Sequence, residues 1–228
     1  TGFAHVPLVC ASCLYDLGIG DALARPDADM AYHACLDAAG NRVACGNVGA
    51  GTGCTVGKLN GAEFMMKSGL GCYAARMGDV MVGAVVAVNA LGDVFDIDTG
   101  KRLAGMLSPD KKSFADSERE LLRTCAERAD NLFTGNTTIG CVLTNAAFDK
   151  TRLKKIAAMS HNGLARTIRP VHTSADGDSI YALSSGRVRA HQDAVGTLAA
   201  YVMGKAVNAA VRCAVGTADC PAARDLSF

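Results

Sequence analysis

Apolar residues gather along the chain in patterns that predict several strands. Residues 79–89 (DVMVGAVVAVN) are almost wholly apolar and rich in valine, as in a strand covered on both faces. Residues 137–144 (TTIGCVLT) and 179–184 (SIYALS) predict two further strands. Residues 6–15 (VPLVCASCLY) predict a buried strand or extended segment. Predicted strands are therefore spread over most of the chain.

Helical spacing of apolar residues marks other parts of the chain. One predicted helix follows Pro26 and ends at Gly40, and a charged one has Ser117 and Glu120 at capping-box spacing, which indicates a surface helix. Gly163 is predicted to end a third helix. The predicted helices cover residues 27–39, 113–128, 149–162 and 195–210. Because strands and helices occur in clusters and not in strict alternation, they predict a layered α+β sandwich.

The composition is that of one large globular domain. The 228 residues are 50% hydrophobic, enough for a sizeable core, and contain neither a repeat nor a domain linker. Charges balance at 23 Lys+Arg against 22 Asp+Glu without a basic stripe, which argues against nucleic acid as a partner. No apolar run reaches transmembrane length without glycine or charged interruptions, which argues against a membrane.

The ten cysteines do not indicate a disulfide framework. The chain is long, no signal peptide precedes it, and most cysteines lie among small apolar residues, so a reducing cytoplasm is the expected location. Cys10 and Cys13 form a C-x-x-C pair, but without a second pair at zinc-finger spacing they are weak evidence for a metal. The chain opens at Thr1 directly into an apolar stretch, which predicts that an N-terminal piece is missing.

A glycine-rich segment, residues 46–58 (GNVGAGTGCTVGK), is similar to a nucleotide-binding loop but fails both tests for one. In a Walker A loop, Leu59 would have to be Ser or Thr, and Thr52 would have to be Gly. A dinucleotide fingerprint would need a third glycine where Cys54 stands. The segment is therefore interpreted as a tight turn that delivers Lys58, either to solvent or beside a reaction centre.

Residues 134–138 (TGNTT) open an apolar strand, and their chemistry suits cleavage of the backbone by its own side chain. The Thr137 hydroxyl would attack the Asn136 carbonyl, and water would resolve the resulting ester. Thr137 would then carry a free α-amine, which titrates near pH 8 and can act as base for its own hydroxyl. On the residues alone, an ordinary turn before a strand remains the alternative.

Residues 172–178 (HTSADGD) place two carboxylates, Asp176 and Asp178, around one glycine. The remaining ligand positions of an EF-hand loop are absent. The segment is either an Asp-Gly turn or a pair of acceptors that orient a hydroxyl or an ammonium. The five histidines form no defensible triad, and His172 is interpreted as a packed or turn histidine.

Taken together, these segments resemble one family over nearly the whole chain. It comprises the DmpA-type L-aminopeptidase/D-amidase-esterases, the β-peptidyl aminopeptidases and the NylC-type nylon-oligomer hydrolases. The segments that carry the resemblance are 1–21, 46–58, 82–94, 135–146 and 168–184. The GNTTI and HT..DGD motifs, in this order, are its most specific part.

The resemblance implies a four-layer αββα sandwich similar to that of N-terminal nucleophile hydrolases, with its own connectivity. It implies cleavage of one hydrolase domain between Asn136 and Thr137, into a larger part (1–136) and a smaller part (137–228) that stay together. It also implies a homo-oligomer and requires neither a metal nor an organic cofactor. Family members normally carry a substantial segment before the point matching Thr1, and that segment supplies sheet strands.

The resemblance also assigns an active site. The matching positions are Tyr15, Lys58, Asn89, Thr137, Asp176 and Asp178. Thr137 corresponds to the nucleophile, and Asn89 and Tyr15 are suited to donate hydrogen bonds to the developing oxyanion. Lys58 would polarise Thr137 and help keep a nearby amine neutral. The acidic pair would orient this arrangement.

Three functions compete on the sequence. The first is hydrolysis of small peptides or amides through an acyl-enzyme on Thr137. The second is acyl transfer, because ornithine acetyltransferases share a related fold and also cleave themselves before a threonine. The third is a non-catalytic fragment or binding module. Cys54 and Cys141 lie inside the active-site motifs, and Cys141 is expected in the core, although its thiol is open to oxidation.

Overall fold

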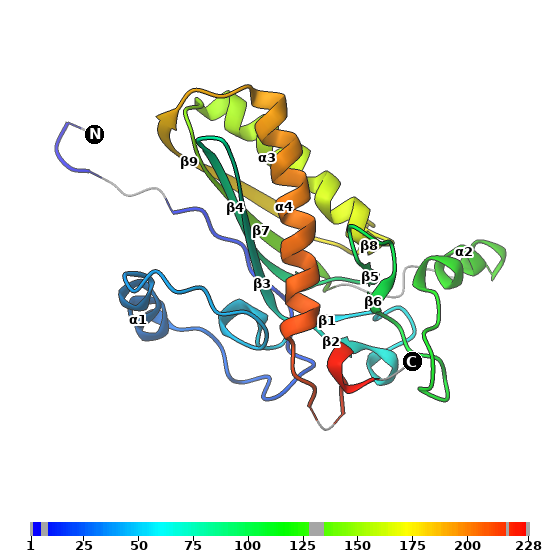
Figure 1. Cartoon of the computed structure of the whole chain (residues 1–228). Helices are drawn as coiled ribbons and strands as arrows, with labels where there is room; N and C mark the ends of the chain where they lie inside the picture. Colours follow the sequence, from blue (N-terminus) through cyan, green and yellow to red (C-terminus); the bar gives the residue numbers. More distant parts are fainter. Residues whose placement is uncertain (1, 6–8, 128–134, 218, 227–228) are drawn as a thin grey trace.

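The computed structural model describes residues 2–5, 9–127, 135–217 and 219–226, and these form a mixed α+β protein (Figure 1). The helices are α1 (Ala28–Ala38), α2 (Ser117–Glu127), α3 (Lys150–Thr167) and α4 (Gln192–Cys213). The strands are β1 (Thr55–Val56), β2 (Met66–Lys67), β3 (Leu70–Met77), β4 (Val80–Asn89), β5 (Asp93–Phe95), β6 (Arg102–Ala104), β7 (Thr137–Ala146), β8 (Ile168–Arg169) and β9 (Ser179–Val188). The predicted α+β class is confirmed.

The central sheet has the strand order β3-β4-β7-β9. A turn at Gly78, whose φ of 59° suits glycine, joins β3 and β4 into an antiparallel hairpin. Strand β7 lies antiparallel to β4 and parallel to β9. The parallel pair needs a crossover, which α3 and β8 supply. Two small sheets, β1-β2 and β6-β5-β8, lie at the side of the central sheet.

Helices α3 and α4 cover one face of the central sheet (Figure 1). The side chains on this face, such as Val82, Val86 and Val142, join Ile156 of α3 and Met203 of α4 in one buried core. Helix α4 is long and apolar enough to span a bilayer, but most of that stretch is buried in this core. Burial of the two apolar helix faces against the sheet is the main source of stability here.

Helix α3 does not end at Gly163 as predicted but continues to Thr167. A Cβ on Gly163 would lie 2.3 Å from the Ala200 carbonyl oxygen and 2.9 Å from Met203 Cβ, both on α4. The glycine therefore permits a close helix crossing and does not act as a cap. The sequence pattern of a C-cap and that of a tight crossing are the same single glycine.

Helix α2 also begins differently from the prediction. The side chain of Asp116, not Ser117, accepts the hydrogen bond of the first turn, from the Arg119 backbone N–H at 2.9 Å. The Ser117 hydroxyl instead donates to buried Asp93 at 2.7 Å, so it anchors the helix start to β5. Helix α1 matches its prediction, with Asp27 as N-cap.

The outer face of the central sheet, opposite α3 and α4, is covered only in part. Met81, Leu143 and Leu183 on this face are about half exposed, so the prediction that 79–89 is covered on both faces is wrong for its first half. The described part of segment 6–15 is also neither a strand nor buried. It crosses the outer face as an irregular chain, where the Tyr181 hydroxyl donates to the Ala11 carbonyl at 3.1 Å.

The described residues thus form a two-layer arrangement of a helix pair on a sheet. This corresponds to one helix layer and one sheet layer of the expected αββα sandwich. Strand β4 belongs to the part before residue 137 and β7 to the part after it, and they pair along eight residue positions. A cut before Thr137 would therefore leave the two parts joined by a continuous ladder.

Candidate active site

The residues expected to act lie at one end of the central sheet, because β4 ends where β7 begins. The register pairs Asn89, the last residue of β4, directly with Thr137, the first residue of β7. Both lie on the outer face, and both are buried, with exposed fractions of 0% and 9%. The strand pairing thus brings together two residues that are far apart in sequence.

The carbonyl group of Asn136 is held between a hydroxyl and a backbone amide. The Thr137 hydroxyl donates to the Asn136 oxygen at 2.5 Å, and the Gly177 backbone N–H donates to the same oxygen at 2.9 Å. The Gly177 N–H polarises this carbonyl and is placed to stabilise the oxyanion that develops on its oxygen. The hydroxyl of Thr137 is therefore positioned next to the carbonyl that it would have to attack.

Gly177 reaches this carbonyl because the loop before β9 runs beside the start of β7. Asn136 and Asp176 form a parallel bridge, and the Asn136 N–H donates to the Ala175 oxygen at 3.3 Å. A Cβ at Gly177 would lie 3.1 Å from Thr137 Oγ1. The absence of a side chain at this position is what allows the close approach.

The side-chain amide of Asn89 is oriented from both ends. Its oxygen accepts from the Thr55 N–H at 3.2 Å and from Lys58 Nζ at 2.7 Å. Its nitrogen donates to the Tyr15 carbonyl at 2.9 Å and to the Gly135 carbonyl at 3.4 Å. The Thr55 N–H and Lys58 Nζ, which donate to the amide oxygen, fix the orientation of the Asn89 amide. Its NH₂ group therefore points toward the residues that precede Thr137.

Tyr15 contributes its backbone to this arrangement. Its side chain is 62% exposed, and its ring lies against Gly135, where a Cβ would come within 2.7 Å of Tyr15 Cδ1. The predicted role of the Tyr15 hydroxyl as a second oxyanion donor stays a prediction.

Lys58 is delivered by a turn in which the chain passes close to its neighbours. Gly57 has a φ of 69°, and a Cβ there would lie 2.0 Å from the Met106 nitrogen. The ammonium donates to both oxygens of Asn89, so the alternative of a solvent-exposed lysine is wrong. Burial lowers the pKa of Lys58 to about 8, although nearby acidic groups act in the opposite direction. A lysine with this pKa exchanges protons near neutral pH.

The two carboxylates differ in their surroundings. Asp176 accepts from the N–H and the hydroxyl of Thr173, at 3.0 and 2.7 Å. Burial raises the pKa of Asp176, and the charge of Asp178 adds to this effect. Asp178 accepts from the Thr138 N–H at 2.7 Å, one residue after Thr137. Both carboxylates therefore border the reaction centre, Asp176 through the Gly177 loop and Asp178 through the β7 backbone.

The family of this chain follows from a comparison with family models, in which peptidase family S58 matches residues 3–221. The chain belongs to this family. An uncharacterized aminopeptidase of Mycobacterium leprae is 39% identical over 196 residues, covering 81% of this chain and 51% of that protein. An uncharacterized aminopeptidase of Mycobacterium tuberculosis is 36% identical over 241 residues, covering 97% of this chain and 67% of that protein.

The chain is also similar to a nylon-oligomer hydrolase and to a solved aminopeptidase structure. The 6-aminohexanoate-oligomer endohydrolase of a Kocuria species is 28% identical over 225 residues, covering 91% of this chain and 62% of that protein. A structure of the L-aminopeptidase D-Ala-esterase/amidase from Ochrobactrum anthropi has a TM-score of 0.49 at 18% identity, covering 78% of this chain and 48% of that chain. The chain thus spans about half to two thirds of the length of the curated relatives that it matches.

Sequence reasoning missed several residues that the structure places at this candidate site. Gly177 was only the spacer between two carboxylates, and His172 was assigned a packing role. Asp16 accepts from the Gly53 N–H at 3.1 Å and so ties the glycine-rich segment to the N-terminal one. The contacts of Asp16 and Gly177 connect residues 37 or more positions apart, and no local sequence pattern indicates them. Cys54 is fully buried, and burial raises its thiol pKa to about 12, so its thiol is not reactive.

Cys141, expected in the core, lies on the outer sheet face and is partly exposed. Burial raises the pKa of its thiol, and Cys10 adds to this effect.

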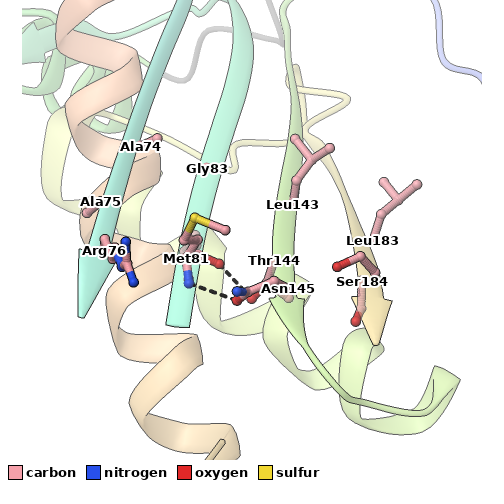
Figure 2. Close-up of a pocket in the computed structure, with 12 residues that line it drawn as sticks. Ala74, Ala75, Arg76, Met81, Gly83, Leu143, Thr144, Asn145, Leu183 and Ser184 are labelled. Atoms are coloured by element: carbon pink, nitrogen blue, oxygen red, sulfur yellow. Dashed lines mark hydrogen bonds between the residues drawn. The ribbon is translucent and has the colours of Figure 1, made fainter. Parts of the chain in front are cut away.

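A surface pocket of about 600 Å³ lies elsewhere on the outer sheet face (Figure 2). Met81, Leu143 and Leu183, on the neighbouring strands β4, β7 and β9, line this pocket. Along β7 the lining residues of the pocket, Leu143 to Asn145, are six to eight residues from Thr137, or about 20–26 Å at roughly 3.3 Å per residue. It therefore belongs to the uncovered sheet face and not to the reaction centre.

Proposed function

We propose that this chain is the precursor of an N-terminal threonine amide hydrolase that cleaves itself between Asn136 and Thr137. The observation that carries the proposal is the Asn136 carbonyl, which accepts from both the Thr137 hydroxyl and the Gly177 N–H. Thr137 Oγ1 attacks the Asn136 carbonyl carbon, the C–N bond breaks, and its nitrogen takes up the hydroxyl proton. Water then hydrolyses the ester, which leaves a carboxylate on Asn136 and a free α-amine on Thr137.

The mature site then uses the same groups for a substrate amide. The Thr137 α-amine accepts the hydroxyl proton as Oγ1 attacks the substrate carbonyl. The Asn89 NH₂ group, held by Lys58 and Thr55, donates to the developing oxyanion. The proton passes to the leaving amine, and water releases the acyl group from Thr137. Positive charge on Lys58 favours the neutral, proton-accepting form of the α-amine.

The substrates proposed are small peptides or other linear amides. Family membership supports this class, since the relatives include proteins named as aminopeptidases and as a 6-aminohexanoate-oligomer endohydrolase. Among the described residues, β4 and β7 remain paired after the cut, which supports a mature enzyme of two associated parts, 1–136 and 137–228. Assembly into a homo-oligomer and a cytoplasmic location stay predictions.

The decisive experiment is the intact mass of the purified chain under denaturing conditions, followed over time. We expect two species, residues 1–136 and 137–228, from the wild-type chain. Thr137→Ala is expected to stay a single chain of 228 residues, because it lacks the attacking hydroxyl. Thr138→Ala is the matched control, since that hydroxyl lies on the helix-covered face of β7, and it is expected to process normally. Cleavage in Thr137→Ala, or an uncleaved wild-type chain, would overturn the proposal.

A further inference from the structure

His172 lies at the edge of the proposed site and contacts one of its carboxylates. His172 Nδ1 is 2.8 Å from Asp178 Oδ2, with 36% of the histidine side chain and 4% of the aspartate side chain exposed. The backbone of His172 has a φ of 57°, in the left-handed region that few non-glycine residues occupy. This unusual conformation directs the imidazole back toward Asp178 from the loop that leads to Gly177.

The same carboxylate is bound to the strand of the nucleophile. Asp178 Oδ1 accepts from the Thr138 N–H at 2.7 Å, and Thr138 directly follows Thr137. Asp178 therefore links the imidazole of His172, through Oδ2, to the backbone at the start of β7, through Oδ1. Asp178 Oδ2 lies at ion-pair distance from His172 Nδ1, and among the described residues no other group forms a hydrogen bond to this oxygen. Within the part of the chain that the structure describes, His172 is therefore the side chain that can hold this buried oxygen in place.

A second histidine, His161 of α3, contacts the other side of the His172 imidazole. His161 Nδ1 on α3 lies 3.3 Å from His172 Nε2, and the two rings meet edge to face at a centroid distance of 4.8 Å. Burial lowers the pKa of His161, and the adjacent His172 adds to this effect. A neutral His161 that carries its proton on Nδ1 donates a hydrogen bond to Nε2 of His172, which leaves the Nδ1–H of His172 to face the Asp178 carboxylate. The titratable groups around His172 are thus Asp178 and, through it, Asp176 on the same loop, with His161 from α3.

We propose that His172 is a positioning residue, which holds the Asp178 carboxylate against the Thr138 N–H and thereby fixes the start of β7 at Thr137. The inference rests on the proposed function, since Asp178 belongs to the same site. His172 does not touch the Asn136 carbonyl in this arrangement and acts only through Asp178. Its effect is therefore expected on the rate of the chemical step, and not on global stability.

The test uses His172→Asn, because asparagine tolerates the left-handed backbone and removes the imidazole. His191→Asn, at an exposed position outside the site, is the matched control. We expect self-cleavage to slow about tenfold in His172→Asn, because Asp178 would lose the contact that holds it against the Thr138 N–H. The double variant His172→Asn/Asp178→Asn should be no slower than Asp178→Asn alone. Wild-type rates in His172→Asn, or independent effects that multiply in the double variant, would overturn the proposal.

A second measurement separates this inference from the proposed function. Amide hydrogen exchange of Thr138 is measured in the uncleaved Thr137→Ala background. It should accelerate about fivefold when His172→Asn is added, because Asp178, which accepts from the Thr138 N–H, is then no longer held by His172. His191→Asn in that background should leave the exchange unchanged. If the wild-type chain never cleaves but the exchange accelerates, the proposed function fails and the role of His172 stands. If the exchange of Thr138 is unchanged, His172 does not position Asp178.

Discussion

Gly177→Ala tests the contact on which self-cleavage depends, because it adds one methyl group beside the reacting atoms. The new Cβ would lie 3.1 Å from Thr137 Oγ1, 3.7 Å from Thr137 Cγ2 and 3.8 Å from the Asn136 oxygen. The first of these distances is shorter than ordinary van der Waals contact, so either the Thr137 hydroxyl or the Gly177 backbone has to move. The φ of Gly177 is not in the left-handed region, and alanine is therefore free of backbone strain there.

The expected magnitude follows from the hydrogen bond that would be disturbed. Removal of one donor to a developing oxyanion typically slows a reaction by about 10²–10³. A shift of a few tenths of an ångström weakens the Gly177 N–H bond to Asn136 and displaces the Thr137 hydroxyl without removing either. We therefore expect self-cleavage to slow by about 10- to 100-fold, which corresponds to roughly 1.4–2.7 kcal/mol of activation free energy.

The assay is the appearance of the 1–136 and 137–228 species by intact mass, in parallel with the thermal unfolding midpoint. Gly83→Ala is the control, because its Cβ would meet only Ala74 Cβ at 3.7 Å and the Tyr73 oxygen at 3.8 Å on the same sheet. It is expected to cleave at the wild-type rate. The reasoning is refuted if Gly177→Ala cleaves as fast as Gly83→Ala while both variants remain folded.

Three further changes probe charge and packing. The stability of Lys58→Met relative to the wild type should depend on pH, because the folded pKa of Lys58 is about 8 and its ordinary pKa is 10.5. As pH falls from above 10.5 to below 8, the unfolding free energy of the variant should rise relative to that of the wild type by up to about 3 kcal/mol. Denaturant titrations at pH 7 and 10.5 that give the same difference between the two proteins would contradict this. The same variant should lose the proton-dependent part of the cleavage rate near pH 8. Lys67→Met should lower the free energy of unfolding by about 1–3 kcal/mol, because the buried ammonium donates to the carbonyls of Gly51, Cys54 and Ser68. An unchanged midpoint of urea unfolding would show that these hydrogen bonds do not stabilise the chain. Gly163→Ala should lower the free energy of unfolding by about 1–3 kcal/mol, because the new methyl group forces α3 and α4 apart. Gly18→Ala, at an exposed position, is the control, and equal unfolding midpoints for the two variants would show that the helix crossing adjusts without cost.

Much of the fold could be predicted from the sequence, because the periods of its apolar residues are local properties. The apolar runs located β4, β7 and β9, and the helical stripe located α4 within a few residues. The same rules failed where one residue type serves two purposes. Gly163 looked like a helix end but permits a helix crossing, and Ser117 looked like a cap but anchors α2 to Asp93.

The candidate site was predicted as a set of segments but not as a geometry. The residues of the GNTTI and DGD motifs stand in the sequence with their chemistry visible, and so the nucleophile and the acidic pair could be named as hypotheses. Nothing in the sequence shows that Asn89 pairs with Thr137 or that Gly177 reaches the Asn136 carbonyl. These contacts depend on strand register and on loop placement, which are set by packing over the whole molecule.

By itself, the sequence determined which side chains are available, where strands and helices form, and that Thr137 follows an asparagine at a strand start. Only the tertiary structure decided that Lys58 is buried against Asn89 and that His172 faces Asp178. The physical reason is that hydrogen bonds and charge interactions act over about 3–4 Å, and residues tens of positions apart reach that distance only when the chain is folded.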